Sequence, residues 1–200
     1  MKITAIKQQE RLKGRYSIYV DEKYAFSLSA DALLDEKLHT GQEFDEQQLK
    51  NYKKLSADDK AYGLSLAYAV RRMRSEWEFR DYFRRKGYEQ DLAEQILEKL
   101  RRHGFVDDAK FAEAWVRNRR MLKSVSKRRL SQELKQKRVA TDIVDQALAE
   151  DEADERSVLR ELIERKHRQT KYQDDLKLMQ YLARQGFSYE DIKSALADAD

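Results

Sequence analysis

Residues 75–88 read SEWEFRDYFRRKGY, and two later segments of the 200-residue chain repeat their pattern. The copies read SKRRLSQELKQKRV at residues 126–139 and DDLKLMQYLARQGF at residues 174–187. Each segment opens on a residue type that caps helices and carries apolar residues at its fifth, ninth and fourteenth positions. Residues four apart lie on one face of a helix. The pattern therefore predicts three equivalent helices, whose buried faces hold the pairs Phe79/Phe83, Leu130/Leu134 and Leu178/Leu182.

Two further helical patterns flank each of these segments. A longer pattern precedes each one, over Lys60–Arg72, Asp108–Met121 and Asp154–His167. A shorter pattern follows and ends with the pairs Ile96-Leu97, Ala147-Leu148 and Ala195-Leu196. The equivalent residues Gly87, Arg138 and Gly186 are 51 and 48 residues apart, and a three-helix unit of that length does not bury its apolar faces well alone. We therefore predict that three such units stack in tandem from Ser56 onward.

The first 55 residues have a different pattern. Apolar and polar residues alternate over Tyr16–Val20 and Tyr24–Leu28, which predicts a β-hairpin, with Lys2–Gln8 as a third strand. Short helices are expected over Ala30–Glu36 and Asp45–Leu55. The predicted fold is mainly α: a tandem array of three three-helix repeats preceded by a small N-terminal β-hairpin and helical extension. The predicted domains are residues 1–55, 56–106, 107–150 and 151–200.

The composition excludes several classes of protein. The chain has no proline and six glycines, which argues against sandwiches and barrels rich in turns. It has no cysteine, which excludes disulfides, thiolate metal sites and cysteine nucleophiles. The first residues contain no apolar signal segment, and no apolar run is long enough to span a bilayer. We therefore expect a soluble cytoplasmic protein with no membrane partner.

The charges are distributed unevenly along the chain. Residues 71–138 hold 21 basic and 11 acidic side chains, whereas residues 139–200 hold 9 and 15. Between Arg117 and Arg138 there are ten basic residues and one acid, Glu133. Such a stretch repels itself, which favours a polyanionic partner. The alternative is that these cations pair with the acidic last third of the chain, and the sequence leaves both interpretations open.

The start of the helix after Ser126 concentrates this charge. Lys127, Arg128 and Arg129 oppose the helix dipole there, and a bound phosphate or acidic side chain would relieve that cost. On the preceding helix, we expect Arg117 and Arg120 to lie opposite the face that holds Phe111, Trp115 and Val116. Arginine binds phosphate and carboxylate alike, so a nucleic acid and an acidic protein both remain possible partners.

No pattern in the sequence predicts catalysis. The glycines are too dispersed for a nucleotide-binding loop, and His39, His103 and His167 are isolated. We interpret His103 as a residue at the carbonyl end of a helix and Asp107-Asp108 as the start of the next helix rather than a Mg²⁺ site. Trp115 follows Phe111 by four residues, which indicates packing rather than stacking on a base. We therefore expect no cofactor, no metal and no enzymatic activity.

Several ordered motifs resemble the bacterial RecX regulatory family, and the resemblance extends over nearly the whole chain. The motifs are Arg74-Ser75-x-x-Glu78-Phe79, Lys86-Gly87-Tyr88, Gly104-Phe105-Val106-Asp107-Asp108-x-x-Phe111-Ala112, Lys127-Arg128-Arg129-Leu130-x-x-Glu133-Leu134 and Gly186-Phe187-Ser188-Tyr189-x-x-Ile192. The N-terminal hairpin resembles the extension of longer members. Arg138 stands where the family usually has glycine, and Gln185 where it usually has arginine.

This resemblance implies a curved, elongated array of helical repeats that is not an enzyme. It implies binding to the RecA recombinase in its filament on single-stranded DNA, and restraint of the recombinase, ATPase and coprotease activities in DNA repair and the SOS response. Contact with DNA phosphates is expected to be weak and salt-sensitive. We expect a monomer. The residues expected to contact RecA or DNA are Arg84, Arg85, Arg117, Arg119, Arg120, Lys123, Lys127, Arg128, Arg129 and Lys135.

Three other functions compete with this interpretation. A stand-alone DNA-binding protein of helix-turn-helix type would bind duplex without RecA. A scaffold for another acidic protein would bind its partner after nuclease treatment. A metal-dependent nuclease would need more ligands than Asp107-Asp108 supply, so this third function is the weakest alternative.

Overall fold

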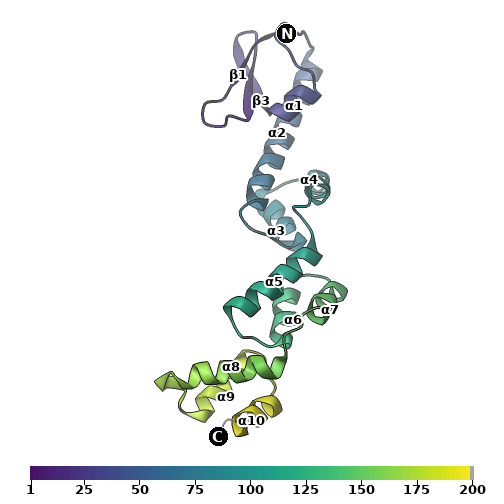
Figure 1. Cartoon of the computed structure of the whole chain (residues 1–200). Coiled ribbons are helices and arrows are strands. Elements are labelled where there is room, and N and C mark those ends of the chain that lie inside the picture. Colours follow the sequence, from purple (N-terminus) through teal and green to yellow (C-terminus); the bar gives the residue numbers. More distant parts are fainter. Residues whose placement is uncertain (199–200) are drawn as a thin grey trace. The chain divides into compact units, whose positions relative to one another are not determined.

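The structure is a computed structural model that describes residues 1–198, and these are mostly helical, with a small sheet near the N-terminus (Figure 1). The described chain forms two compact units. The first consists of residues 1–72 and 83–105, and the second of residues 73–82 together with the chain from Val106 onward. The predicted mainly α fold with an N-terminal β extension is confirmed. Among residues 1–198, no helix combines the length and the apolar composition that crossing a bilayer requires.

The sheet of the first unit has three antiparallel strands in the order β1-β2-β3. They span Ile3–Gln8 (β1), Arg15–Val20 (β2) and Lys23–Ser29 (β3), as the alternating pattern predicts. Asp21 and Glu22 form the turn between β2 and β3 with φ values of 46° and 69°, a left-handed conformation that matches the twist of a hairpin. The core of this sheet contains Ile3, Ile18 and Phe26, and helices α1 and α2 follow it in the chain.

The prediction of two separate helices over Asp45–Leu55 and Lys60–Arg72 is wrong, because one helix, α2, runs from Glu46 to Ala69. Ser56, at which the first repeat was predicted to begin, lies inside this helix. Ser56 Oγ donates to the carbonyl of Ser27 at 2.6 Å, and Asp59 accepts from the backbone N–H of Ser29 at 2.8 Å. These polar side chains join α2 to β3 and to the start of α1 (Ala30–Asp35) instead of starting a helix. The proposed domain boundary after residue 55 falls within α2.

The three aligned segments form α3 (Glu76–Lys86), α6 (Lys127–Gln136) and α9 (Asp175–Arg184). All six apolar residues predicted for their common face are buried: Phe79, Phe83, Leu130, Leu134, Leu178 and Leu182. The helices also end in the same way. The N–H groups of Tyr88, Val139 and Phe187 bond to carbonyls five residues back, at 3.1, 3.2 and 3.4 Å. This bond belongs to the C-terminal motif that requires a left-handed residue just before it.

That left-handed position is filled by Gly87, Arg138 and Gly186, with φ values of 69°, 58° and 95°. Arg138 therefore adopts the glycine conformation in the second copy, as its place in the alignment predicts. A left-handed residue with a Cβ atom costs about 1–2 kcal/mol. The second repeat keeps its turn at this cost in conformational energy.

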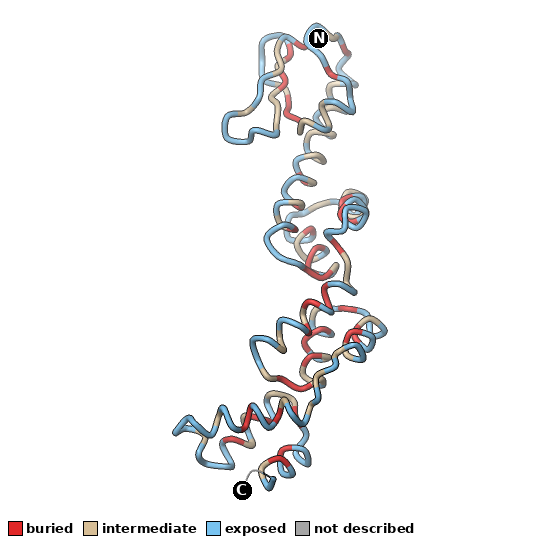
Figure 2. The backbone as a smooth tube through the Cα atoms, viewed as in Figure 1, coloured by how far each residue is buried: buried red, intermediate tan, exposed pale blue. Residues whose placement is uncertain are grey.

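The remaining helices complete the predicted units. They are α4 (Gln90–Arg102), α5 (Asp108–Leu122), α7 (Thr141–Ala149), α8 (Glu155–His167) and α10 (Tyr189–Ala197), with a 3-10 turn at Thr170–Tyr172. Buried and exposed positions alternate along them (Figure 2). One apolar cluster joins α5, α6 and α7 around Leu130, and another joins α8, α9 and α10 around Leu178. The second and third repeats thus each have a core of their own.

Consecutive repeats are joined by contacts between equivalent residues within the second unit. The backbone N–H of Glu76 donates to the Asp108 carboxylate at 2.7 Å, and the N–H of Lys127 donates to Glu155 at 2.8 Å. Each acceptor is the first residue of the first helix in the following repeat. In addition, Ser75 Oγ donates to the carbonyl of Lys137 at 3.0 Å, and the N–H of Ser126 donates to Gln185 at 3.1 Å. The stacking register is therefore set by capping of one repeat by the next.

Candidate interface on the basic second repeat

The Glu133 carboxylate organises the basic stretch from within. Its side chain is 9% exposed and accepts from Arg119 Nε and Nη2, each at 2.7 Å, and from Trp115 Nε1 at 3.0 Å. Arg129 Nε lies 3.4 Å away on the same helix. Trp115 packs against the apolar cluster of the second repeat, as predicted, and the Arg119 guanidinium lies 5.2 Å from its ring centroid. Arg119 therefore connects α5 to α6.

Arg120 and Lys127 pair with the acidic start of the third repeat. Arg120 donates to the Asp151 carboxylate at 2.6 and 3.0 Å, and its side chain is 13% exposed. The prediction that Arg120 lies on a face opposite Val116 is wrong, since residues four apart share a face and that face is buried here. Lys127 Nζ donates to the backbone carbonyl of Asp151 at 2.8 Å. Its own N–H donates to Glu155, so the chain itself supplies the anion expected at the start of α6.

Four predicted residues remain exposed and have no ion pair within residues 1–198: Arg117, Lys123, Arg128 and Lys135. Arg84 and Arg85 are also exposed, in the last turn of α3. Part of the basic stretch is therefore neutralised internally. Glu133 lies within the stretch itself, and in the described chain only the contacts of Arg120 and Lys127 with Asp151 are of the kind that the alternative interpretation describes. The cations that are not neutralised are the ones available to a partner.

These cations do not all gather in one place. Arg117 lines a hollow at the end of α5 together with Met121, Glu150 and Glu152, so the charges there are mixed. Arg128 lies on α6 with Gln132 and Lys135, at positions four and seven residues apart that share one exposed helix face. Arg128 and Arg129 open onto a second hollow, whose lining includes Arg184 and Tyr189 of the third repeat.

Arg184 and Tyr189 are candidate residues that the sequence reasoning missed. The alignment contains a signal for Arg184, because it stands two residues before Gly186, just as Arg85 stands two residues before Gly87. Arg184 is thus the third-repeat equivalent of Arg85, which the sequence predicts as a contact residue. Tyr189 has no such signal, since only its 65% exposure distinguishes it from a packed aromatic residue.

Asp107 and Asp108 start a helix, as predicted. Asp107 caps α5 by accepting from the N–H of Lys110 at 3.0 Å, and this bond is the main cause that holds the pKa of Asp107 below its usual value. Asp108 accepts from Glu76. Nowhere in residues 1–198 do three or more aspartate, glutamate or histidine side chains gather in a way that suits a metal ion.

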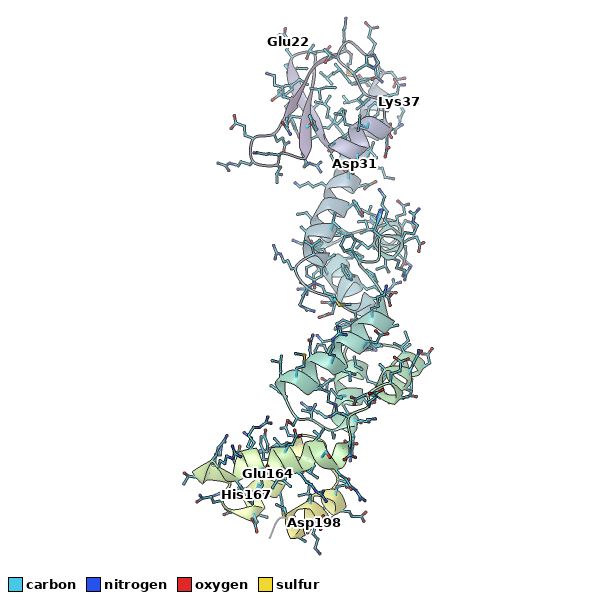
Figure 3. All side chains as sticks on the ribbon, in the orientation of Figure 1. Glu22, Asp31, Lys37, Glu164, His167 and Asp198 are labelled. Atoms are coloured by element: carbon cyan, nitrogen blue, oxygen red, sulfur yellow. The ribbon has the colours of Figure 1, made fainter. Side chains whose placement is uncertain are left out.

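Two of the three histidines also lie at helix ends. His103 is the C-cap of α4, which agrees with its predicted place at the carbonyl end of a helix. His167 is the last residue of α8, three residues after Glu164 on the same helix (Figure 3). Each lies apart from the basic hollow described above, because neither lines it.

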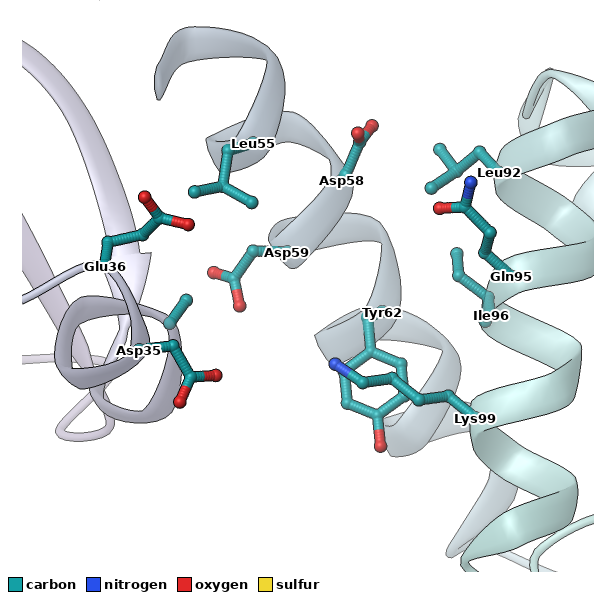
Figure 4. A pocket seen from close by; sticks show the side chains of 11 residues that line it. Asp35, Glu36, Leu55, Asp58, Asp59, Tyr62, Leu92, Gln95, Ile96 and Lys99 are labelled. Atoms are coloured by element: carbon teal, nitrogen blue, oxygen red, sulfur yellow. The ribbon is translucent and has the colours of Figure 1, made fainter. Parts of the chain in front are cut away.

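A hollow in the first unit has the opposite charge. It lies beside α2 and is lined by Asp35, Glu36, Asp58 and Asp59 (Figure 4). Lys99 Nζ lies 4.6 Å from the ring centroid of Tyr62 in this hollow. Burial raises the pKa of the Tyr62 hydroxyl, and the charge of Asp31 adds to the effect. An acidic lining repels phosphate, so this hollow does not suit a polyanionic partner.

Four family models match successive parts of the chain. The RecX N-terminal domain matches residues 1–45, and the first, second and third three-helix domains of RecX match residues 61–100, 107–148 and 154–196. The matched ranges coincide with the N-terminal sheet and the three repeats. They agree with the expected order of the repeats along the chain.

Curated relatives carry the same family description. The regulatory protein RecX of Bacillus pumilus is 33% identical over 205 residues, which cover 98% of this chain and 77% of the relative. The RecX proteins of Listeria innocua and Listeria monocytogenes are 34% identical over 117 residues. That match covers 58% of this chain and 44% of each Listeria protein, so it spans less than half of their length.

Two solved structures share the fold. A crystal structure of a regulatory protein RecX superposes with a TM-score of 0.75 at 29% identity and covers 98% of both chains. A crystal structure of RecX from Lactobacillus salivarius superposes with a TM-score of 0.60 at 22% identity, over 70% of this chain and 95% of the other. The second similarity supports the fold alone.

Proposed function

The chain belongs to the RecX family of regulatory proteins, and from that premise we propose that it regulates a RecA recombinase by binding the filament that RecA forms on single-stranded DNA. The single observation that carries this proposal is the similarity to the Bacillus pumilus regulatory protein over 98% of the chain. A regulatory role for the family is stated by its name. The partner and the effect on it are the proposal.

The exposed cations of the first two repeats are the proposed contact residues. Arg117, Lys123, Arg128 and Lys135 have no ion pair within residues 1–198, so their charge is available to phosphates or to acidic protein surface. Arg84 and Arg85 are exposed in the last turn of α3 and are proposed as further contacts.

The other predicted residues have a positioning role in this proposal. Arg119 and Arg129 pair with Glu133, while Arg120 and Lys127 bind Asp151. A guanidinium or ammonium group already held by the chain gains less from a partner, because the new contact replaces an existing one. These residues therefore fix the helices that carry the contact residues.

Binding of this kind would restrain the ATPase, strand-exchange and coprotease activities of RecA without a reaction on this chain. The proposed context is DNA repair and the SOS response in the cytoplasm, with the chain acting as a monomer. Direct contact with DNA phosphates would weaken as salt rises, because phosphate neutralisation releases counterions.

The test is a titration of the full chain into RecA assembled on single-stranded DNA, with ATP hydrolysis as the readout. We expect the wild-type chain to slow hydrolysis in proportion to its concentration. A variant with Arg117→Glu, Lys123→Glu, Arg128→Glu and Lys135→Glu should lose this effect and keep its helical content in circular dichroism.

The matched control reverses four exposed lysines outside the basic repeat, with Lys50→Glu, Lys53→Glu, Lys54→Glu and Lys193→Glu. It has the same net charge as the test variant and should inhibit like the wild type. Hydrolysis that is unchanged by the wild-type chain would refute the proposed function. Equal inhibition by the folded test variant would refute the assigned contact residues.

A further inference from the structure

A cationic hollow of about 710 Å³ opens between α6 and the turn that joins α9 to α10, within the second unit. Its lining includes Arg128, Arg129 and Gln132 from the second repeat, and Arg184 and Tyr189 from the third. Its volume falls in the range of roughly 300–1,000 Å³ that is typical of ligand sites. The hollow is therefore large enough to hold a small charged group and a planar ring together.

The charge of this hollow is not compensated by its own lining. Three arginines line it, and within residues 1–198 no carboxylate lines it. Arg129 is held by Glu133 at 3.4 Å, while Arg128 and Arg184 are exposed and have no ion pair in the described chain. Like charges brought together in this way cost free energy until an anion binds. The hollow therefore favours a ligand with at least one phosphate or carboxylate group.

Gly186 gives the hollow a fixed shape. At φ +95°, a Cβ atom on this residue would lie 2.8 Å from Arg129 Cβ and would also meet Ser126 Oγ. The N–H of Ser126 donates to the Gln185 carbonyl at 3.1 Å, so the end of α9 lies directly against the start of α6. Because backbone packing sets this distance, Arg128 and Arg184 are presented on two elements that are held together without a ligand.

Tyr189 adds an aromatic surface to the charge. It is the first residue of α10, and 65% of it is exposed, although it lines the hollow. An exposed aromatic face next to arginines is the combination on which unpaired bases stack while their phosphates are neutralised. Acidic protein segments need the arginines but have no planar group that requires this ring. The aromatic surface therefore favours nucleic acid over an acidic peptide.

We propose that the cationic hollow is a subsite for single-stranded nucleic acid, in which Arg128 and Arg184 bind backbone phosphates and Tyr189 stacks on a base. Duplex is a poorer ligand, because its bases already stack on each other and do not reach a side-chain ring from the phosphate side. This inference adds a nucleic-acid subsite to the proposed function. It rests on the proposed function in one respect, because the single strand is taken to be the DNA strand in the RecA filament.

The test measures binding of the full chain to a fluorescently labelled oligothymidylate by anisotropy, without RecA. Tyr189→Ala should weaken binding about tenfold, the usual order for loss of one stacked base. Tyr189→Phe should bind like the wild type, since it keeps the ring. Arg184→Gln should weaken binding and reduce the slope of log K against log salt by about 0.7, the value for one phosphate contact on a single strand.

The control Arg168→Gln removes an exposed cation at the C-cap of α8, outside the hollow, and should leave both affinity and slope near wild type. The subsite is overturned if Tyr189→Ala binds as tightly as Tyr189→Phe, or if Arg184→Gln behaves like Arg168→Gln. It is also overturned if polyglutamate displaces the labelled strand as well as unlabelled oligothymidylate does. RecA-dependent ATP hydrolysis tests the proposed function separately, so failure of the subsite and failure of the proposed function are distinguishable.

Discussion

Glu133 determines how many cations of the basic stretch are available to a partner. It is the single acid between Arg117 and Arg138, and it is buried. A buried carboxylate is costly unless charged or polar donors satisfy it. Arg119 and Trp115 supply those donors from α5, and Arg129 of α6 adds an ion pair at 3.4 Å. The basic stretch thus contains its own counterion, and two of its arginines belong to the fold.

Replacing Glu133 tests this role. Glu133→Ala should lower the free energy of unfolding by about 2 kcal/mol, because it leaves the Trp115 N–H and the Arg119 guanidinium without their acceptor. Urea unfolding followed by circular dichroism measures the change. Glu113→Ala removes an exposed acid on α5 and should change stability by less than about 0.5 kcal/mol. Equal stabilities of the two variants would show that the Glu133 network contributes nothing.

The sequence predicts the candidate site only in part, because it does not show which cations are paired inside the fold. Periodicity correctly places Arg128 and Lys135 on α6, but it does not tell which cations have an acid within reach. Glu133 is 14 residues from Arg119, and Asp151 is 31 residues from Arg120. Such pairings depend on how helices pack, which a local pattern does not encode.

Asp107 leads to a prediction about pH. Its pKa is lowered in the folded chain, chiefly by the N–H of Lys110, so its contribution to stability is present above its unfolded pKa of about 4. That contribution is lost as pH falls through the lower folded value. Asp107→Asn keeps an acceptor for the cap and does not titrate. Its free energy of unfolding should therefore fall less between about pH 5 and pH 3 than that of the wild type. Parallel losses in both proteins would contradict the role assigned to Asp107.

Among the elements, the repeated helices are the ones that the sequence predicts best. The buried pairs of α3, α6 and α9 and the left-handed residue after each helix are all local features. The prediction of helix boundaries fails at α2, where Ser56 and Asp59 have the spacing of a helix start but lie inside one helix. In the structure these side chains bind Ser27 and Ser29 of the preceding strand. A capping pattern and a tertiary contact use the same residue types, so the pattern alone does not distinguish them.

Alanine substitutions at Gly87 and Gly186, which follow α3 and α9, allow the cost of backbone strain to be measured apart from the cost of close packing. Gly87 and Gly186 both have positive φ values, but a Cβ atom on Gly87 would meet nothing within 4 Å. Gly87→Ala should therefore cost about 1 kcal/mol, the value for strain alone. Gly186→Ala should cost about 3 kcal/mol, because its Cβ atom also meets Ser126 and Arg129. Equal losses in urea unfolding would show that close packing at Gly186 does not hold the second and third repeats together.

For the molecule as a whole, the acidic residues that join consecutive repeats also determine which cations remain unpaired. The joints between repeats use Asp108 and Glu155 to cap α3 and α6, and Asp151 holds Arg120 and Lys127. The acidic starts of the second and third repeats thus satisfy polar groups of the repeat before each of them. The remaining exposed cations on α6 and at the end of α5 are Arg117, Lys123, Arg128 and Lys135, and they form no ion pair within residues 1–198. In the proposed function, a filament of protein and DNA recognises the charge of these residues.

The most direct measurement of this claim is the affinity of the fluorescently labelled chain for RecA filaments on single-stranded DNA, as a function of salt concentration. Binding should be tight at low salt and weaken with a log–log slope of about −3, as expected if Arg117, Lys123, Arg128 and Lys135 each meet a phosphate. The variant with these four residues reversed should show no saturable binding. Salt-independent binding, or equal affinity of the folded variant, would contradict the account.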